Sequence, residues 1–239
     1  MVFATPRRTY CGAILTALFF AMSVHPLVHA AEVKAQLVVE GGGPSAHNKA
    51  GKTLSAVIWL KPVQPDAVPA VAPGKFTLLQ KNKMFTPHLL VVPVGSSVAF
   101  PNADPFFHNV FSLFDGKRFD LGLYEAGSTR SVMFSREGVS YIFCNIHSEM
   151  SAVVIALDTP FYSIAGPQGA FQIEGVPNGD YSLHVWIEGQ AQNSLDQLTR
   201  QVHIAGATVT LDDIHAGAPK RQHLNKFGHP YEPDPVPTY

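Results

Sequence analysis

The segment YIFCNIHSEM, residues 141–150, contains three side chains that bind soft metal ions. Cys144, His147 and Met150 follow one another at steps of three residues. Thiolate and thioether sulfurs select soft metals such as copper, and imidazole is a good copper ligand as well. A tight loop that follows a strand can turn all three side chains toward one point. The sequence therefore predicts that this segment supplies three ligands to one metal ion.

A fourth ligand is predicted in the upstream segment NADPFFHNVFS, where His108 lies at a strand edge after a turn. Two imidazoles, one thiolate and one weak axial thioether form the donor set of a blue-copper electron-transfer centre. Zinc fits less well, because methionine is a poor zinc ligand and structural zinc sites usually carry more thiolates. An iron–sulfur cluster needs more than one cysteine. We therefore expect one mononuclear copper ion, as Cu(I) or Cu(II), bound by His108, Cys144, His147 and Met150.

The start of the chain predicts export. Residues 1–30 contain an arginine pair, then an apolar run, then Val-His-Ala before the expected cleavage point, which is the pattern of a secretory signal peptide. The run is too short for a convincing membrane span, so we expect a periplasmic protein that does not span the membrane after signal removal. Of the two cysteines, Cys11 and Cys144, only Cys144 remains. An unpaired thiol in an oxidising compartment is either occupied, for instance by a metal, or buried and inert.

Alternating apolar and polar residues predict β-strands through most of the remaining chain. AQLVVE, SAVIWL, LLVVPV, RSVMF, SYIF, AVVIAL and YSLHVWI are examples, and Gly, Pro, Asn and Asp separate them. Short strands at this spacing favour antiparallel β-sandwiches. The predicted fold class is therefore all-β.

The segments FPNADPFFHNVFS and GVSYIFCNIHSEMSAVVIAL resemble the cupredoxin family of plastocyanin- and amicyanin-like blue copper proteins. The resemblance covers roughly residues 75–158, and it depends on an upstream His-Asn pair followed by a Cys-x₂-His-x₂-Met loop. It implies a Greek-key β-sandwich for this part of the chain.

The same resemblance implies roles for five residues. His108, Cys144 and His147 correspond to the strong copper ligands, and Met150 corresponds to the weak axial ligand. Asn109 corresponds to the residue that ties the two ligand loops together. His147 corresponds to the ligand that faces solvent, through which electrons pass.

A second segment, GAFQIEGVPNGDYSLHVWIEG at residues 169–189, resembles the carboxypeptidase-regulatory or transthyretin-like β-sandwich. Phe171 and Ile173 alternate on one strand, and Pro-Asn-Gly forms a hairpin turn into the next strand. Modules of this kind are usually structural or adhesive, so the resemblance implies no catalytic residue.

Together these observations predict a cupredoxin Greek-key β-sandwich combined with a second small β-sandwich. We expect the second sandwich to be discontinuous, from residues 31–70 plus 159–214, with the cupredoxin domain, residues 75–158, inserted between the parts. Residues 216–239 are expected to form an extended tail. The alternative is two domains in series, with an N-terminal extension that completes the cupredoxin sheet.

The predicted function is one-electron transfer between redox partners, such as a c-type cytochrome or a dehydrogenase. Four protein ligands leave no evident position for a substrate, so the protein is not expected to be an enzyme. The alternatives are a periplasmic copper-binding or delivery protein and a non-redox β-sandwich binding module. The formal net charge of −1, without a basic block, makes nucleic acid an unexpected partner.

Overall fold

The computed structural model describes residues 1, 30–40, 55–64, 71–113 and 116–217. Over these residues the fold is all-β, which confirms the predicted class, and the only α-helix among them is the short α1 (Gln192–Asp196). None of their helices is long and apolar enough to cross a membrane. The predicted signal peptide lies outside the described residues except for its two end residues, and so does the predicted tail beyond residue 217.

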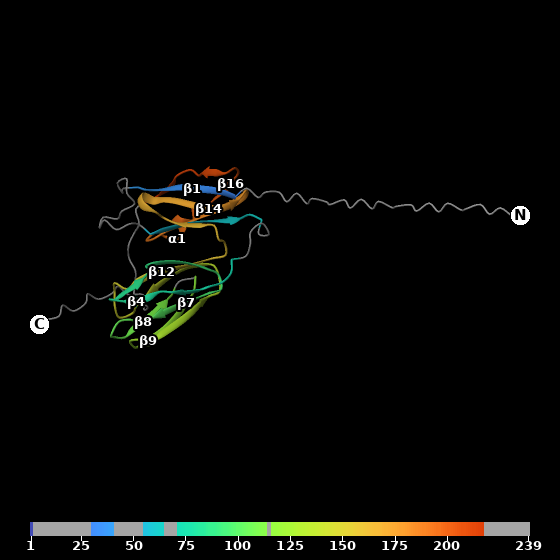
Figure 1. Cartoon of the computed structure of the whole chain (residues 1–239). Coiled ribbons are helices and arrows are strands. Elements are labelled where there is room, and N and C mark those ends of the chain that lie inside the picture. The colour runs from blue at the N-terminus through green and yellow to red at the C-terminus, as the bar shows by residue number, and fades with distance from the viewer. Residues whose placement is uncertain (2–29, 41–54, 65–70, 114–115, 218–239) are drawn as a thin grey trace.

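The strands form two bodies, which lie one above the other in Figure 1. The upper body contains β1 (Ala30–Val39), β2 (Ala56–Pro62), β13 (Tyr162–Ile164), β14 (Ala170–Pro177), β15 (Gly179–Ile187), β16 (Arg200–Ile204), β17 (Thr208–Thr210) and β18 (Ile214–Ala216). One of its sheets has the order β14–β1–β17, with β18 also paired to β1, and the other has the order β13–β2–β15–β16. Val33, Ile58 and Leu183 are among the fully buried residues of their shared core. The upper body is thus a small β-sandwich.

The lower body is built from the strands between residues 75 and 157. They are β3 (Lys75–Thr77), β4 (Leu79–Lys81), β5 (Met84–Thr86), β6 (Leu89–Pro93), β7 (Ser96–Pro101), β8 (His108–Ser112), β9 (Phe119–Tyr124), β10 (Thr129–Phe134), β11 (Gly138–Phe143) and β12 (Ser151–Leu157). They form a five-stranded sheet, β6–β12–β11–β8–β9, a three-stranded sheet, β10–β7–β3, and the β4–β5 hairpin. A second core that includes Phe100, Val110 and Phe134 fills the body.

Strand β12 contributes to both cores. Val153 and Ile155 pack into the core of the upper body, whereas the alternate residues Ala152 and Val154 pack into the core of the lower body. Successive side chains of a strand point to opposite faces, so a strand covered on both faces needs a continuous apolar run instead of an alternating one. The sequence AVVIAL is such a run. One face of β12 therefore packs into the core of the upper body and the other face into the core of the lower body.

Polar side chains also join the two bodies. The Nζ of Lys61, on β2, lies 2.5 Å from a carboxylate oxygen of Glu137 and 3.1 Å from a carboxylate oxygen of Asp158. His88, just before β6, places its Nε2 2.8 Å from Glu188, just after β15. These side chains are only partly buried, so each Lys61 ion pair is worth roughly 0–1 kcal/mol, and the His88–Glu188 contact is a hydrogen bond at the same boundary. The apolar surface around β12 is the main source of cohesion.

Candidate metal centre

Three of the predicted ligands come together at one end of the lower body. Cys144 directly follows β11, His108 is the first residue of β8, and His147 lies in the loop that leads to β12. Strands β8 and β11 are neighbours, with Phe111 paired to Phe143, so the sheet brings His108 next to Cys144. The alternation along β11 turns Ile142 and then Cys144 toward the core of the lower body.

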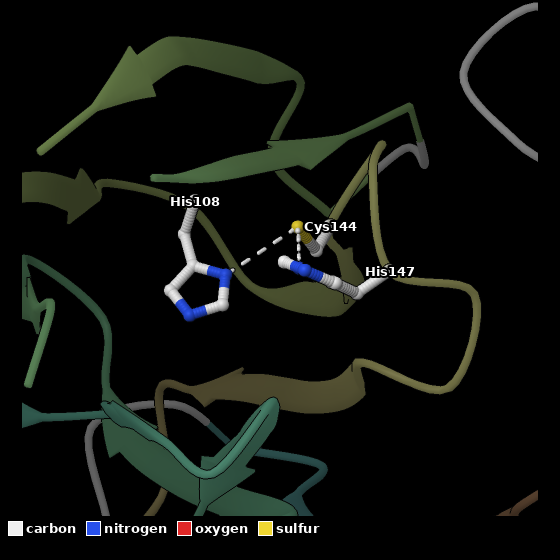
Figure 2. Close-up of side chains that lie close together, drawn as sticks. All are labelled: His108, Cys144 and His147. Atoms are coloured by element: carbon white, nitrogen blue, oxygen red, sulfur yellow. Dashed lines mark hydrogen bonds between the residues drawn. The ribbon is translucent and has the colours of Figure 1, made fainter. Parts of the chain in front are cut away.

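The donor atoms of these residues face one another. The Sγ of Cys144 lies 3.8 Å from Nδ1 of His108 and 3.6 Å from Nδ1 of His147, and Figure 2 shows both rings turned toward the sulfur. All three donor atoms lie within 4.8 Å of one another. Cys144 and His108 are completely buried, whereas His147 is partly exposed. The arrangement is a compact, largely enclosed cluster that opens to solvent on the His147 side.

The spacing of these donors fits a single first-row metal ion. An imidazole nitrogen bound at about 2.0 Å and a thiolate bound at about 2.3 Å, as in zinc sites, lie about 3.7 Å apart when the bonds meet at about 120°. The sulfur-to-nitrogen distances of 3.8 and 3.6 Å agree with this value. One thiolate and two imidazoles form the trigonal donor set that suits copper.

The fourth predicted ligand, Met150, is buried in the same core as Cys144. Two backbone hydrogen bonds close the loop between them: the Cys144 N–H donates to the Met150 carbonyl at 3.2 Å, and the Met150 N–H donates to the His147 carbonyl at 3.1 Å. The loop is therefore a tight turn with both ends fixed. The backbones of Cys144 and Met150 therefore lie next to each other.

Asn109, expected to tie the two ligand loops together, is almost completely buried. Its Nδ2 donates a hydrogen bond to Asp120 on β9 at 2.7 Å, and its Oδ1 has no hydrogen-bond partner among the described residues. The side chain thus links β8 to the next strand of the sheet. Its role between the ligand loops remains a prediction.

A carboxylate that the sequence analysis did not single out contacts one of the ligands. The Oδ2 of Asp104 lies 2.8 Å from Nε2 of His108, and both side chains are buried. Burial opposes ionisation, but hydrogen bonds from the Lys83 N–H, His108 and the Asn82 N–H outweigh it and keep the pKa of Asp104 below its ordinary value. The spacing of four residues in DPFFH was a possible signal, although Asp before Pro is also an ordinary turn residue.

An aromatic residue packs against both histidine rings of the cluster. The ring centroid of Phe106 is 5.2 Å from that of His108 and 5.5 Å from that of His147. Phe106, Phe107 and Ile146 are all exposed large apolar residues, and together we call them the outer rim. Phe106 contacts His147, and Phe107 and Ile146 directly precede the two histidines in the chain, so an approaching molecule would meet exposed apolar residues near His147.

Comparisons with known proteins found no protein-family profile and no curated relative that matches the chain. Among solved structures, a novel purple cupredoxin from Nitrosopumilus maritimus is 24% identical, with 34% of this chain and 98% of that chain covered, at a TM-score of 0.31. A copper-containing nitrite reductase from Thermus scotoductus is 23% identical over 41% of this chain and 25% of that chain, at a TM-score of 0.34. A reduced mutant of amicyanin is 21% identical over 36% of this chain and 86% of that chain, at a TM-score of 0.33.

Proposed function

We propose that the protein is an exported type 1 copper protein of the cupredoxin kind, which transfers single electrons between redox partners. The observation that carries the proposal is the convergence of one cysteine and two histidines within 4.8 Å. Cys144 and His108 are buried together at the end of a rigid sheet, with Met150 in the same core. A soft, enclosed donor set of this composition is the signature of a blue-copper centre.

In this proposal His108, Cys144 and His147 bind copper strongly and Met150 binds it weakly. A copper ion bound there would supply a one-electron couple between Cu(I) and Cu(II). The residues contribute stiffness: strands β8 and β11 hold two ligands, and the closed loop holds the other two. Ligands that move little when the charge of the ion changes keep the barrier to electron transfer small.

We infer further that the protein is an electron carrier and not an enzyme. With all four donors supplied by the chain, no coordination position is reserved for a substrate, in contrast to catalytic metal sites that keep one position open. The enclosed ligands also argue against copper delivery, which requires ready transfer of the ion to an acceptor. His108 and Cys144 are both inaccessible to solvent.

The proposed partners are other redox proteins, such as a c-type cytochrome or a dehydrogenase. Electrons would enter and leave through His147, since it is the ligand that reaches the surface. The apolar outer rim gives such partners a contact surface whose burial is favourable. The signal peptide expected at residues 1–30 would direct the protein to the periplasm, where exported electron carriers meet their partners.

The test is visible absorption and EPR spectroscopy of the purified protein after addition of Cu(II). An intense visible band with a narrow copper hyperfine splitting, bleached reversibly by a reductant, supports electron transfer. A colourless protein that holds Cu(I) tightly and passes it to an acceptor would instead support delivery. A protein that binds no copper in either oxidation state would refute the proposal and favour a non-redox binding module.

A further inference from the structure

Asp104 lies in the turn between β7 and β8, four residues before His108 and next to its buried ring. The Oδ2 of Asp104 is 2.8 Å from Nε2 of His108, the ring nitrogen that does not face Cys144. The other nitrogen, Nδ1, lies 3.8 Å from the cysteine sulfur. The imidazole is thus held between a carboxylate on one side and the metal centre on the other.

The turn of the β4–β5 hairpin donates two backbone hydrogen bonds to the Asp104 carboxylate. The backbone N–H of Asn82 donates to Oδ1 of Asp104 at 2.6 Å, and the N–H of Lys83 donates to Oδ2 at 2.9 Å. Both residues have positive φ angles, 55° and 54°, a conformation that a lysine rarely adopts. Two successive N–H groups in such a turn form a concave site that favours a negative charge.

Asn102 fixes the other side of the turn that carries Asp104. Its Oδ1 accepts a hydrogen bond from the Asp104 N–H at 3.0 Å, and its Nδ2 donates to the Phe106 carbonyl at 2.8 Å. Asn102 is itself buried. The carboxylate is therefore fixed in position by backbone on one side and by a buried amide on the other.

We propose that Asp104 is the positioning residue of the metal centre: it fixes the tautomer and ring orientation of His108, so that the Nδ1 lone pair faces Cys144. The β4–β5 hairpin becomes the outer support of the centre through Asp104. This inference rests on the proposed function, because it assigns a role in binding copper.

The chemistry follows from the properties of a carboxylate. An ionised carboxylate only accepts hydrogen bonds, so a neutral His108 ring that keeps this contact carries its proton on Nε2 and leaves Nδ1 available as a ligand. A carboxylate partner also makes the imidazole a stronger donor to a metal. A stronger donor favours Cu(II) over Cu(I), so Asp104 is expected to lower the reduction potential of the centre.

The first experiment needs no copper. Two-dimensional ¹⁵N NMR of the histidine rings in the metal-free protein reports which nitrogen carries the proton, and a His108→Gln variant identifies the His108 signals. The wild type is expected to show His108 protonated on Nε2 alone, and Asp104→Ala to show a mixture of tautomers. An unchanged pure tautomer in Asp104→Ala would overturn the inference, whether or not the protein binds copper.

The second experiment measures the reduction potential of the copper-loaded protein. Asp104→Asn keeps the size of the side chain and removes its charge, so we expect Cu(II) affinity to fall about tenfold relative to Cu(I), which raises the potential by about 59 mV. The control is Glu125→Gln, which removes an exposed carboxylate next to Tyr124, the residue paired with His108 across β8 and β9. The control is expected to shift the potential much less.

The outcomes separate the two proposals. Wild-type protein that takes up no copper refutes the proposed function, while the NMR experiment still decides the role of Asp104. Copper-loaded wild type with equal potentials in Asp104→Asn and Glu125→Gln refutes the role of Asp104 and leaves the proposed function standing. If Asp104→Ala fails to fold, as judged by thermal unfolding, the same NMR measurement on Asp104→Leu replaces it, because Leu keeps the size of the side chain and accepts no hydrogen bond. An unchanged pure tautomer there overturns the inference.

Discussion

The indole Nε1 of Trp186 donates a hydrogen bond to the hydroxyl of Tyr141 at 3.0 Å, across the boundary between the two bodies. Trp186 lies on β15 of the upper body and is almost completely buried, and Tyr141 lies on β11, three residues before Cys144. Burial raises the pKa of Tyr141, so its hydroxyl stays neutral. The candidate metal centre therefore lies at the end of a strand that is hydrogen-bonded directly to the other body.

Replacing Tyr141 by Phe removes the acceptor of this hydrogen bond. The buried indole N–H of Trp186 then loses the oxygen to which it donates. An unsatisfied buried donor costs about 1–3 kcal/mol, so we expect the free energy of unfolding to fall by about that amount. Urea denaturation monitored by tryptophan fluorescence measures the change. The visible spectrum of the copper-loaded variant should match that of the wild type, and a loss of colour would show that Tyr141 also shapes the centre.

Copper is expected to stabilise the folded protein, because the donor atoms of Cys144, His108 and His147 converge only in the native state. A ligand present at about 100 times its dissociation constant adds about 2.7 kcal/mol of stability. Thermal unfolding with and without added copper measures the effect, and a chelator should reverse it. In Cys144→Ser both the stabilisation and the visible colour should be lost, and a variant that keeps its colour would contradict the ligand assignment.

Replacing Met150 by Leu tests the weak axial ligand with little change in volume. Buried swaps that conserve volume usually cost less than about 1.5 kcal/mol, so the variant should fold and bind copper. Loss of this weak axial donor leaves the ion in a more apolar surrounding, which disfavours the more highly charged Cu(II) relative to Cu(I). The reduction potential should therefore rise by up to about 59 mV, the value for a tenfold change in relative affinity. Cyclic voltammetry measures it, and an unchanged or lower potential would exclude Met150 as a ligand.

His184 gives the metal-free protein a predictable response to pH. Its ring stacks on Trp59, with 5.4 Å between ring centroids, and burial lowers its pKa from the ordinary value of 6.5. The unfolded chain then binds a proton at a higher pH than the native state does. The free energy of unfolding is therefore unaffected by His184 above about pH 6.5. It decreases as the pH falls from about 6.5 through the lowered pKa of His184 in the native state.

His184→Phe keeps an aromatic ring against Trp59 and removes the titration. The difference in unfolding free energy between pH 7.5 and pH 5 should therefore be smaller in the variant than in the wild type. Urea denaturation of both metal-free proteins at the two pH values measures it. Equal differences in the two proteins would show that His184 does not contribute to the acid sensitivity.

The sequence predicts the part of the candidate site whose residues lie close together in the chain. Cys144, His147 and Met150 lie within seven residues, so one tight loop between two strands was enough to place them together. His108 is 36 residues away from Cys144, and only the pairing of β8 with β11 brings it close. The donor set needs a second imidazole, and this chemical requirement indicates His108 where the local spacing does not.

Other features depend on contacts that no local pattern reveals. Strand β9 was not among the predicted segments, although its apolar residues Phe119, Leu121 and Leu123 do alternate. Asp120 and Gly122 between them are residue types that are rare in strands and typical of turns. Asp104 gains its place next to His108 only after the β4–β5 hairpin folds against it, through the N–H groups of Asn82 and Lys83. These donors are backbone N–H groups, so the residue types in the sequence do not indicate them.

Strand β12 has a consequence for how the chain can be divided. An excised fragment of residues 75–158 would expose Val153 and Ile155, which are now covered by the upper body, as a bare apolar stripe. Such a stripe on a sheet face promotes self-association. Neither body is a portable module that could be grafted onto another chain unchanged. Any shortened form of this protein would need polar replacements along one face of β12.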